Sequence, residues 1–170
     1  QKIALNSNLR YPGKLIVIQN QPFLPWDDDL LAISDTGNNW IVIVSLTTFR
    51  CLEVIGVGSI GLIDGSYSET WFHHPQGLCH VFWENKHFIY VCDTKNHAIW
   101  EINLMEREVL TVIGTGEKGK DWEGNLDPEV QKLSSPWDLV AINWDTLIIA
   151  MAGVHQIWAL NLKNVRKFYP

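Results

Sequence analysis

The sequence predicts an all-β fold built from a repeated four-stranded unit, and three observations lead to this prediction. The 170 residues are 46% hydrophobic and include nine tryptophans, which is enough apolar side chain for a packed core. Short runs rich in Val, Ile, Trp and Phe end at Gly, Asn, Asp or Pro, as strands separated by turns do. Long apolar periodicity of 3.6 residues is missing, and the strongest helical candidate, 127–133, is one or two turns within a connection.

A unit of about 58 residues recurs along the chain. Asp35 in the first copy corresponds to Asp93 in the second, and Gly56 corresponds to Gly114 at the same spacing of 58 positions (93 − 35). In a third, degenerate copy Ala152 takes the place of the aspartates, and a proline turn precedes each copy. The copies span about 9–58, 72–116 and 133–170 of one partial domain, 1–170.

The second copy shows the elements of the repeat in order. Its four strands are expected at 78–83, 88–92, 98–103 and 109–113. Asn85-Lys86 joins the first two strands, and the Asp-Thr-Lys-Asn turn at 93–96 joins the next two. An Asp side chain in such a turn can accept hydrogen bonds from backbone amides two residues on. Structural turn roles are therefore predicted for Asp35, Asn38, Asp93 and Asn96. A repeated four-stranded antiparallel meander is typical of β-propeller blades.

The order of a Pro-x-Gly opening, two strands, an Asp-Thr-x-Asn turn, a third strand and a closing Ile-Gly-x-Gly resembles NHL-repeat propellers over nearly the whole chain. The runs 134–140 and 149–160 strengthen the resemblance, in particular to animal NHL-repeat proteins in which a thioredoxin-like domain precedes a six-bladed propeller. The resemblance implies that this chain is about three blades of a six-bladed ring. No CxxC motif is present in the sequence, so a redox activity is not assigned to these residues.

Length supports a partial ring independently of the resemblance. At about 58 residues a blade, 170 residues give just under three blades, whereas propellers close with roughly four to eight. Isolated half-rings would expose blade faces that normally pack together, so self-association of the isolated segment is expected.

The net charge indicates which kinds of binding partner are disfavoured, and the cysteines indicate a cellular compartment. Thirteen Lys and Arg against 19 Asp and Glu give a net charge of −6, which disfavours nucleic acid and anionic membranes. RNA binding, known among NHL propellers with basic surfaces, is the third functional hypothesis. No apolar run approaches the roughly 20 residues of a membrane-spanning helix. Cys51, Cys79 and Cys92 lack metal or redox spacing and are interpreted as reduced core residues of a cytoplasmic chain.

Two motifs imitate ligand sites. The pattern G-x-G-x-x-G occurs at 56–61 and 114–119, but no helix is predicted after it, so the glycines are expected to supply positive φ angles in connections. The run Asp27-Asp28-Asp29 lacks the ligand spacing and glycine of a calcium loop and is interpreted as a solvated hairpin loop. We expect no cofactor, no metal site and no catalytic residue in this segment.

The interaction candidates are exposed aromatic and imidazole side chains. Trp71, Trp122 and Trp137 lie in or beside the long connections 58–75 and 116–136, which suit binding on a rigid scaffold. His97 and His155 occupy equivalent repeat positions and could project from one face.

The leading functional hypothesis is a non-catalytic propeller scaffold that binds a protein partner or another domain of the same chain. The alternative is a metal-assisted lyase or hydrolase with its site in missing blades or the central channel. Only Lys14 and His80 are titratable on the first strands predicted here, which disfavours a channel site within this segment.

Overall fold

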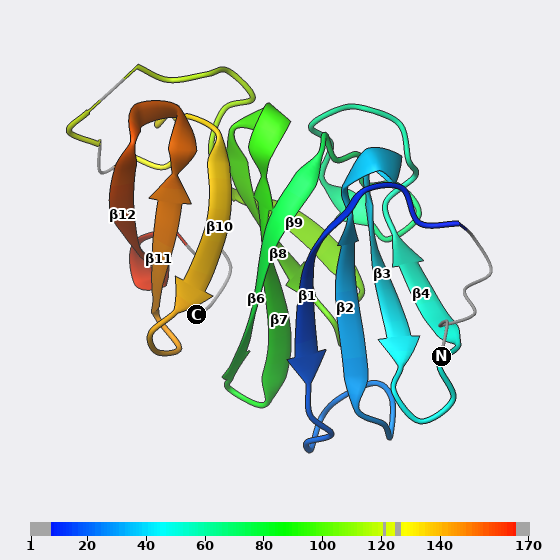
Figure 1. The fold of residues 1–170 in the computed structure, drawn as a ribbon. Coiled ribbons are helices and arrows are strands. Elements are labelled where there is room, and N and C mark those ends of the chain that lie inside the picture. The colour runs from blue at the N-terminus through cyan, green and yellow to red at the C-terminus, as the bar shows by residue number, and fades with distance from the viewer. Residues whose placement is uncertain (1–7, 121, 125–126, 166–170) are drawn as a thin grey trace.

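The computed structural model describes residues 8–120, 122–124 and 127–165, and these form three antiparallel sheets placed side by side in an arc (Figure 1). The first sheet contains β1 (Pro12–Ile18), β2 (Leu30–Asp35), β3 (Trp40–Ser45) and β4 (Cys51–Ile55), paired in chain order. The second contains β6 (Pro75–Trp83), β7 (Lys86–Asp93), β8 (Ala98–Asn103) and β9 (Glu108–Ile113), with the two-residue β5 (Gly65–Ser66) beside β9. The third contains β10 (Pro136–Ala141), β11 (Thr146–Met151) and β12 (Gln156–Asn161).

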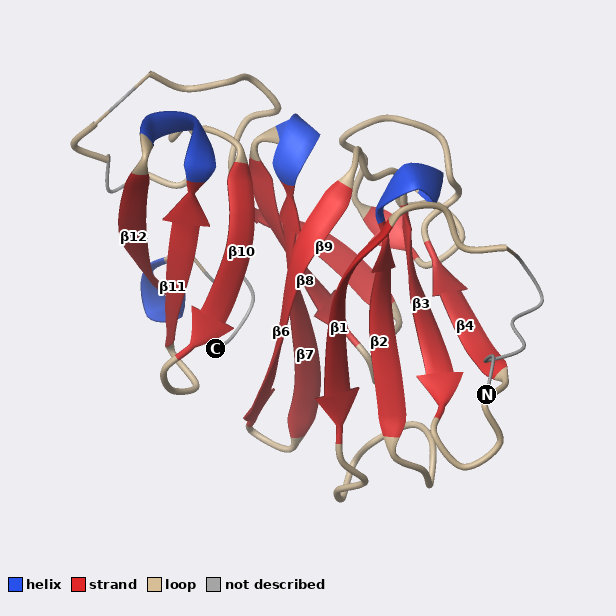
Figure 2. Ribbon diagram, in the orientation of Figure 1, coloured by secondary structure: helices blue, strands red, loops and turns tan. Residues whose placement is uncertain are grey.

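The all-β prediction is confirmed. The described residues contain helix only as single 3₁₀ turns, drawn blue in Figure 2. They are η1 (Thr36–Asn38), η2 (Thr94–Asn96), η3 (Ala152–Val154) and η4 (Leu162–Asn164). Of the third predicted copy, residues 166–170 lie outside the described residues, as do residues 1–7 of the predicted domain.

The second sheet differs from its predicted bounds at the first hairpin. β6 starts at Pro75 rather than at 78, and Lys86 already belongs to β7. The turn is therefore Glu84-Asn85, and both residues have positive φ angles, 47° and 60°. Two consecutive left-handed residues are what a type I′ hairpin turn requires, because this turn matches the twist of the strands that it joins.

Apolar side chains fill the spaces between neighbouring sheets. Between the first and second sheets, Phe72 meets Trp100 edge to face at 5.1 Å, and both side chains are fully buried. Between the second and third sheets, Tyr90 and Cys92 of β7 share a core with Met151 of β11. The two central strands of the second sheet, β7 and β8, are buried on both faces, which explains their nearly continuous apolar sequence.

The first strands of the three sheets lie next to one another, with β6 between β1 and β10 (Figure 1). Lys14 of β1 reaches across to Asp138 of β10, with 2.6 Å between Nζ and Oδ2. A Cβ atom on Gly77 would come within 2.6 Å of the Asp138 backbone, so glycine permits this close approach.

The third repeat is aligned one residue away from the predicted register. Pro12 pairs with Asp35, Pro75 with Asp93, and Pro136 with Met151. Met151, and not Ala152, therefore stands at the aspartate position, and the spacing stays at 58 (151 − 93). Ala152 corresponds instead to the threonine of the turn.

Candidate interaction surface

Three 3₁₀ turns, η1, η2 and η3, lie at one end of the sheets, uppermost in Figure 2. The same end carries the starts of β1, β6 and β10. We call it the turn end.

The aspartates of the turns hold the chain that enters their own sheet. Asp35 Oδ1 accepts a hydrogen bond from the backbone N–H of Arg10 at 2.7 Å, and Asp93 Oδ1 accepts one from His73 at 2.9 Å. Neither side chain caps its own 3₁₀ turn. The prediction of a local turn bond was therefore wrong in its partner, because the accepted amides lie 25 and 20 residues upstream.

Each of these aspartates also accepts two side-chain hydrogen bonds. At Asp93, Oδ2 accepts the Asn96 amide at 2.6 Å and the Trp100 indole N–H at 3.0 Å. Asp35 is bonded in the same way by Asn38 and Trp40, each at 2.7 Å. The predicted turn residues thus form two small networks that also orient a tryptophan.

Burial raises the pKa of Asp93 to about 7, and its hydrogen bonds from His73, Asn96 and Trp100 lower it by less. The carboxylate is fully enclosed, so desolvation disfavours its charged form.

The other two side chains of the turn join one sheet to the next. The Thr36 hydroxyl donates to the carbonyl of Pro75, and the Thr94 hydroxyl donates to that of Pro136, both at 2.7 Å. Asn39 Oδ1 accepts the backbone N–H of His74 at 2.9 Å. The threonine of the Asp-Thr-x-Asn motif and the residue that follows the motif therefore connect neighbouring sheets.

His97 occupies the position of Asn39 and has the same role. Its Nδ1 accepts the backbone N–H of Ser135 at 3.0 Å, which places the ring proton on Nε2. His155 stands at the corresponding position of the third sheet and is exposed. Asn39, His97 and His155 all have left-handed φ angles, from 50° to 57°.

The three candidate tryptophans lie on different elements. Trp71 is half-buried: its backbone pairs with Ile63, and a Cβ on Gly61 would come within 2.9 Å of its ring. Trp137 is 53% exposed on β10, and Trp122 is 64% exposed in the connection that precedes β10. The structure thus leaves two of the three available for contact.

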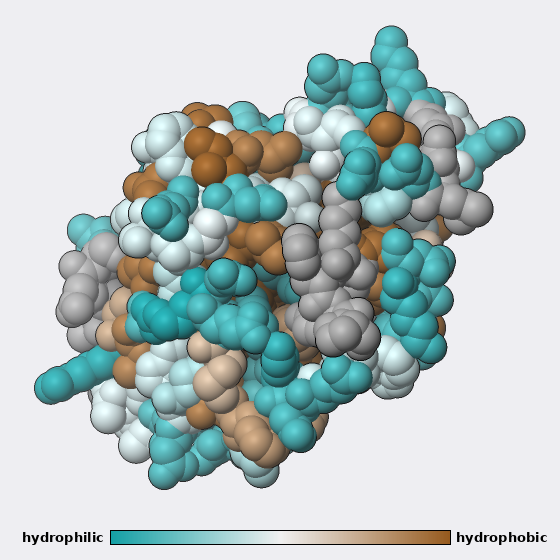
Figure 3. Space-filling view, turned by 180° about the vertical axis from the view of Figure 1, so that it is seen from behind, coloured by the Kyte–Doolittle hydropathy of each residue, from teal (hydrophilic) through white to brown (hydrophobic). Residues whose placement is uncertain are grey.

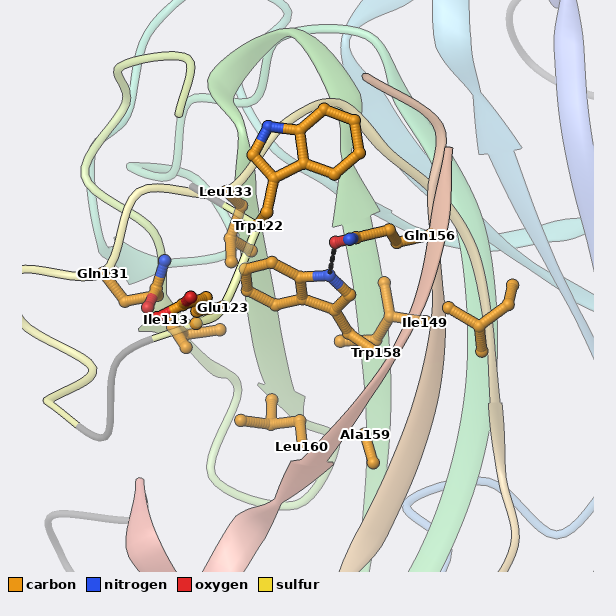
Figure 4. Close-up of a pocket in the computed structure, with 12 residues that line it drawn as sticks. Ile113, Trp122, Glu123, Gln131, Leu133, Ile149, Gln156, Trp158, Ala159 and Leu160 are labelled. Carbon is orange, nitrogen blue, oxygen red and sulfur yellow. Dashed lines mark hydrogen bonds between the residues drawn. The ribbon is translucent and has the colours of Figure 1, made fainter. Parts of the chain in front are cut away.

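Trp122 stands at the edge of a hollow of about 520 Å³ beside β12 (Figure 4). The Trp158 indole lies in the middle of this view, and its N–H donates to Gln156 Oε1 at 2.8 Å. The hollow is lined by residues of β9, β11, β12 and the connection, namely Ile113, Trp122, Glu123, Gly124, Gln131, Leu133, Ile149, Gln156, Ile157, Trp158, Ala159 and Leu160. It combines apolar walls with a few polar groups, a composition suited to ligands or peptide side chains.

Viewed from behind, the molecule shows apolar patches interrupted by hydrophilic residues (Figure 3). On the third sheet, Val140, Ile142 and Ile157 are exposed, and the last of these is 71% accessible. An apolar sheet face of this kind is expected where a further blade packs.

A histidine pair links the second sheet to the first. His80 Nε2 lies 2.9 Å from His87 Nδ1, and His87 Nε2 lies 2.8 Å from the carbonyl oxygen of Pro22. A carbonyl oxygen can only accept a hydrogen bond, so His87 donates to it through Nε2–H. The Nδ1 atom of His87 therefore accepts the hydrogen bond that His80 donates through Nε2–H. Burial and the neighbouring His87 lower the pKa of His80 to about 4, so the His80 ring is neutral at pH 7.

The acidic run 27–29 ties hairpin loops together. Asp28 accepts hydrogen bonds from the hydroxyls of Ser45 and Thr47, which hold its pKa below the usual value. Asp29 accepts the backbone N–H of Asn20 at 2.6 Å. Nothing in this arrangement gathers the three carboxylates on one point.

The predicted glycine role is confirmed at the first two positions of each G-x-G-x-x-G run. Gly56 and Gly114 have φ angles of 108° and 109°, and Gly58 and Gly116 are also left-handed. Gly119 instead allows close packing, because a Cβ there would approach the Lys132 carbonyl oxygen to 2.6 Å.

Cys79 and Cys92 are buried free thiols, and Cys51 is half-buried. Burial raises the pKa of Cys79 to about 12 and that of Cys92 well above its usual value. The described part of the chain contains no cluster of three or more His, Cys, Asp or Glu side chains able to hold a metal ion. None of the described helices has the length and apolar character that a bilayer-spanning helix requires.

Sequence reasoning missed two polar contacts of the first strands. Asp138 was not counted among the titratable residues of the first strands although it belongs to β10, and the His80–His87 pair was not anticipated. A prediction of the turn at Glu84-Asn85 would have indicated the His80–His87 contact. That turn pairs Phe82 with His87, and His80 lies two residues from Phe82 on the same face of the sheet.

The three sheets, each beginning at an inner strand and continuing outward through antiparallel neighbours, define a partial β-propeller. Solved structures with the same fold include a structural genomics protein of unknown function from Bacteroides thetaiotaomicron, with a TM-score of 0.66 and 19% identity over 78% of this chain and 32% of that one. An auxiliary nutrient binding protein from Bacteroides ovatus gives a TM-score of 0.64 and 17% identity over 87% of this chain and 37% of that one.

Sequence comparison confirms the predicted resemblance to NHL-repeat proteins. The chain is 41% identical over 165 residues to NHL repeat-containing protein 2 of Gallus gallus and of Homo sapiens, matching 93% of this chain and 21% of each relative. It is 37% identical over 156 residues to Protein SUPPRESSOR OF QUENCHING 1, chloroplastic, of Arabidopsis thaliana, over 89% of this chain and 14% of the relative. No family model matches the chain. The chain thus spans about a fifth of the length of the curated NHL repeat-containing relatives that it matches.

Proposed function

We propose that this segment is part of a larger NHL-repeat propeller that acts as a non-catalytic scaffold. It would bind a partner protein, or another domain of its own chain, through the connections at the turn end. The observation that carries this proposal is the exposed indole of Trp122 on a long connection, beside a hollow lined by Trp158. Exposed aromatic side chains beside a recess are typical of the residues that dominate protein interfaces.

The packing of the sheets supports such a role. The turns are fixed by buried aspartates and by threonine hydroxyls that reach the next sheet, so the connections start from rigid points. Binding loops on a rigid base lose little conformational entropy when a partner docks.

The curated NHL repeat-containing relatives are named for a repeat and not for a reaction. We therefore favour a non-catalytic role, and the metal-assisted lyase or hydrolase remains a hypothesis about blades outside this segment. A cytoplasmic location also remains a prediction.

The test uses the full-length protein as bait for affinity capture with quantitative mass spectrometry. Trp122→Ala is compared with Met105→Ala, an exposed apolar residue in the β8–β9 turn. We expect Trp122→Ala to reduce specific captured proteins at least about tenfold while melting is unchanged, since hot-spot truncation removes about 2 kcal/mol or more of binding. Undiminished capture by Trp122→Ala, or equal loss with Met105→Ala, would overturn the proposal.

A further inference from the structure

Basic and imidazole side chains gather at the turn end on four consecutive parts of the surface. One precedes β1, two precede β6, two belong to the turn around η2, and one lies in the connection before β10. We call this set the basic turn surface: Arg10, His73, His74, Lys95, His97 and Lys118.

Backbone and ring contacts hold these parts together. The backbone N–H of Lys95 donates to the His73 carbonyl at 3.2 Å, and the His73 and His74 rings lie 5.5 Å apart. His74 is anchored to the first sheet through Asn39, and His97 to the third through Ser135. The surface is thus built by contacts between all three sheets.

The charged groups that shift the pKa values of these histidines are all basic. Burial is the main cause of the lowered pKa values of His73 and His74, and Lys95 lowers both further. Arg10 adds to the effect on His74, and Lys118 adds to that on His97. Each imidazole therefore has at least one lysine neighbour, although the chain as a whole carries −6.

The cations of this surface have no acidic partner. Arg10, Lys95 and Lys118 make no ion pair with any described residue, and all three are exposed. Five other cations do pair with carboxylates, namely Lys14, Lys86, Arg107, Lys132 and Lys163. Of the two other exposed cations without such a pair, Lys120 lies two residues from Lys118, and Arg50 lies in the β3–β4 turn. Three of the five unpaired cations of the described residues thus belong to the basic turn surface.

We propose that the basic turn surface binds an acidic segment of a partner protein, whose carboxylates supply the ion pairs that Arg10, Lys95 and Lys118 lack. This inference rests on the proposed scaffold function and names the chemistry of its partner. Charge complementarity of this kind steers association and selects among partners.

An acidic peptide fits this surface better than a nucleic acid does. The histidines have lowered pKa values and are neutral at pH 7, which leaves three fixed positive charges. Nucleic acid affinity depends on many phosphate contacts, and the net charge of −6 opposes a long polyanion. Two or three carboxylates match three cations, and neutral imidazoles still donate one N–H each.

The test measures binding of a fluorescein-labelled octaglutamate peptide to the full-length protein by anisotropy, at about 50 and about 300 mM salt. The variant Lys95→Gln/Lys118→Gln is compared with Lys86→Gln/Lys163→Gln, which changes the net charge equally but lies outside the basic turn surface. We expect the first variant to weaken binding about tenfold at low salt and to reduce its salt dependence. The second is expected to bind within about twofold of wild type.

Three results would overturn the inference. They are absence of salt-sensitive octaglutamate binding by the wild-type protein, equal loss in both variants, and tighter binding of an octauridylate of similar charge. Melting curves of both variants show whether each is folded. If the Lys95→Gln/Lys118→Gln variant still captures the proteins that Trp122→Ala loses, the scaffold function stands and only the acidic chemistry of the partner is wrong.

Discussion

The second and third sheets share one backbone design but hold it by different chemistry. In the second sheet a buried carboxylate, Asp93, accepts the backbone N–H of His73 and the side-chain donors of Asn96 and Trp100. In the third sheet the sulfur of Met151 stands opposite the backbone N–H of Ser134 at 3.3 Å. The turn geometry is nonetheless the same, with φ angles of 50° and 56° at His97 and His155.

The comparison shows that the polar network is not required to form the turn. The two sheets also differ in their tryptophan: Trp100 is fully buried against Phe72, whereas Trp158 is half-buried and bonded to Gln156. In the second sheet the aspartate thus also bonds a tryptophan of the core between sheets.

Removing the tryptophans should give the largest difference between the two sheets. Trp100→Ala creates a cavity in a closed core and is expected to lower the local opening free energy by about 3–5 kcal/mol. Trp158 lines an open hollow, so Trp158→Ala should lower the local opening free energy by only about 1–2 kcal/mol. Hydrogen exchange of the full-length protein, followed in peptides from β8 and β12, measures both effects. Equal losses would show that the two environments do not differ energetically.

Transferring the third-sheet chemistry into the second tests the network itself. Asp93→Met leaves the Trp100 indole and the His73 backbone N–H without an acceptor, and the Asn96 amide keeps only its bond to the Gly61 carbonyl. We expect a loss of about 3 kcal/mol in β7 and β8. Adding Asn96→Val to Asp93→Met removes one N–H donor that has lost its acceptor. The double variant then has the same two residue types as Met151 and Val154 at the corresponding positions of the third sheet. The double variant should recover about 1 kcal/mol, and further destabilisation would contradict the comparison.

The pH dependence of local stability should also differ between the sheets, by a smaller amount per pH unit. The pKa of Asp93 is about 7 in the folded chain and 3.8 in the unfolded chain. Between these two pH values the folded state therefore binds more protons than the unfolded state. Stability of the second sheet therefore declines as pH rises from about 4 to about 7, by at most about 1.4 kcal/mol per pH unit.

Exchange rates corrected for the intrinsic effect of pH measure this slope. Asp93→Asn should abolish it even though the variant is less stable, and the third sheet serves as an internal reference because Met151 does not titrate. A slope that persists in Asp93→Asn would assign the titration to another group.

The repeat and the strand order could be predicted because they depend on local patterns. Turn residues and alternating apolar runs recur in sequence at a fixed spacing, and the three sheets follow them. The partners of the turn side chains could not be predicted in this way. Asp93 accepts an amide 20 residues upstream, and Thr94 donates to a carbonyl 42 residues downstream, so these contacts depend on how sheets meet.

The candidate surface was predictable in part. The exposure of Trp122 and Trp137 follows from their place beside long connections, whereas the packing of Trp71 on Gly61 depends on how a connection folds back. The basic turn surface has no signature in sequence, because its residues are separated by up to 108 positions (118 − 10).

The ion pair between Lys14 and Asp138 can form only late in the synthesis of this segment. Its two residues are 124 positions apart, and the strand that carries Lys14 leaves the ribosome well before the one that carries Asp138. The first two sheets can pack early through contacts between residues closer in sequence. The contacts among β1, β6 and β10 are completed only when the third sheet has been synthesised. In a nascent chain stalled before residue 138, Lys14 of β1 would therefore lack its carboxylate partner. The rate of translation through 114–138 would influence how long that intermediate persists.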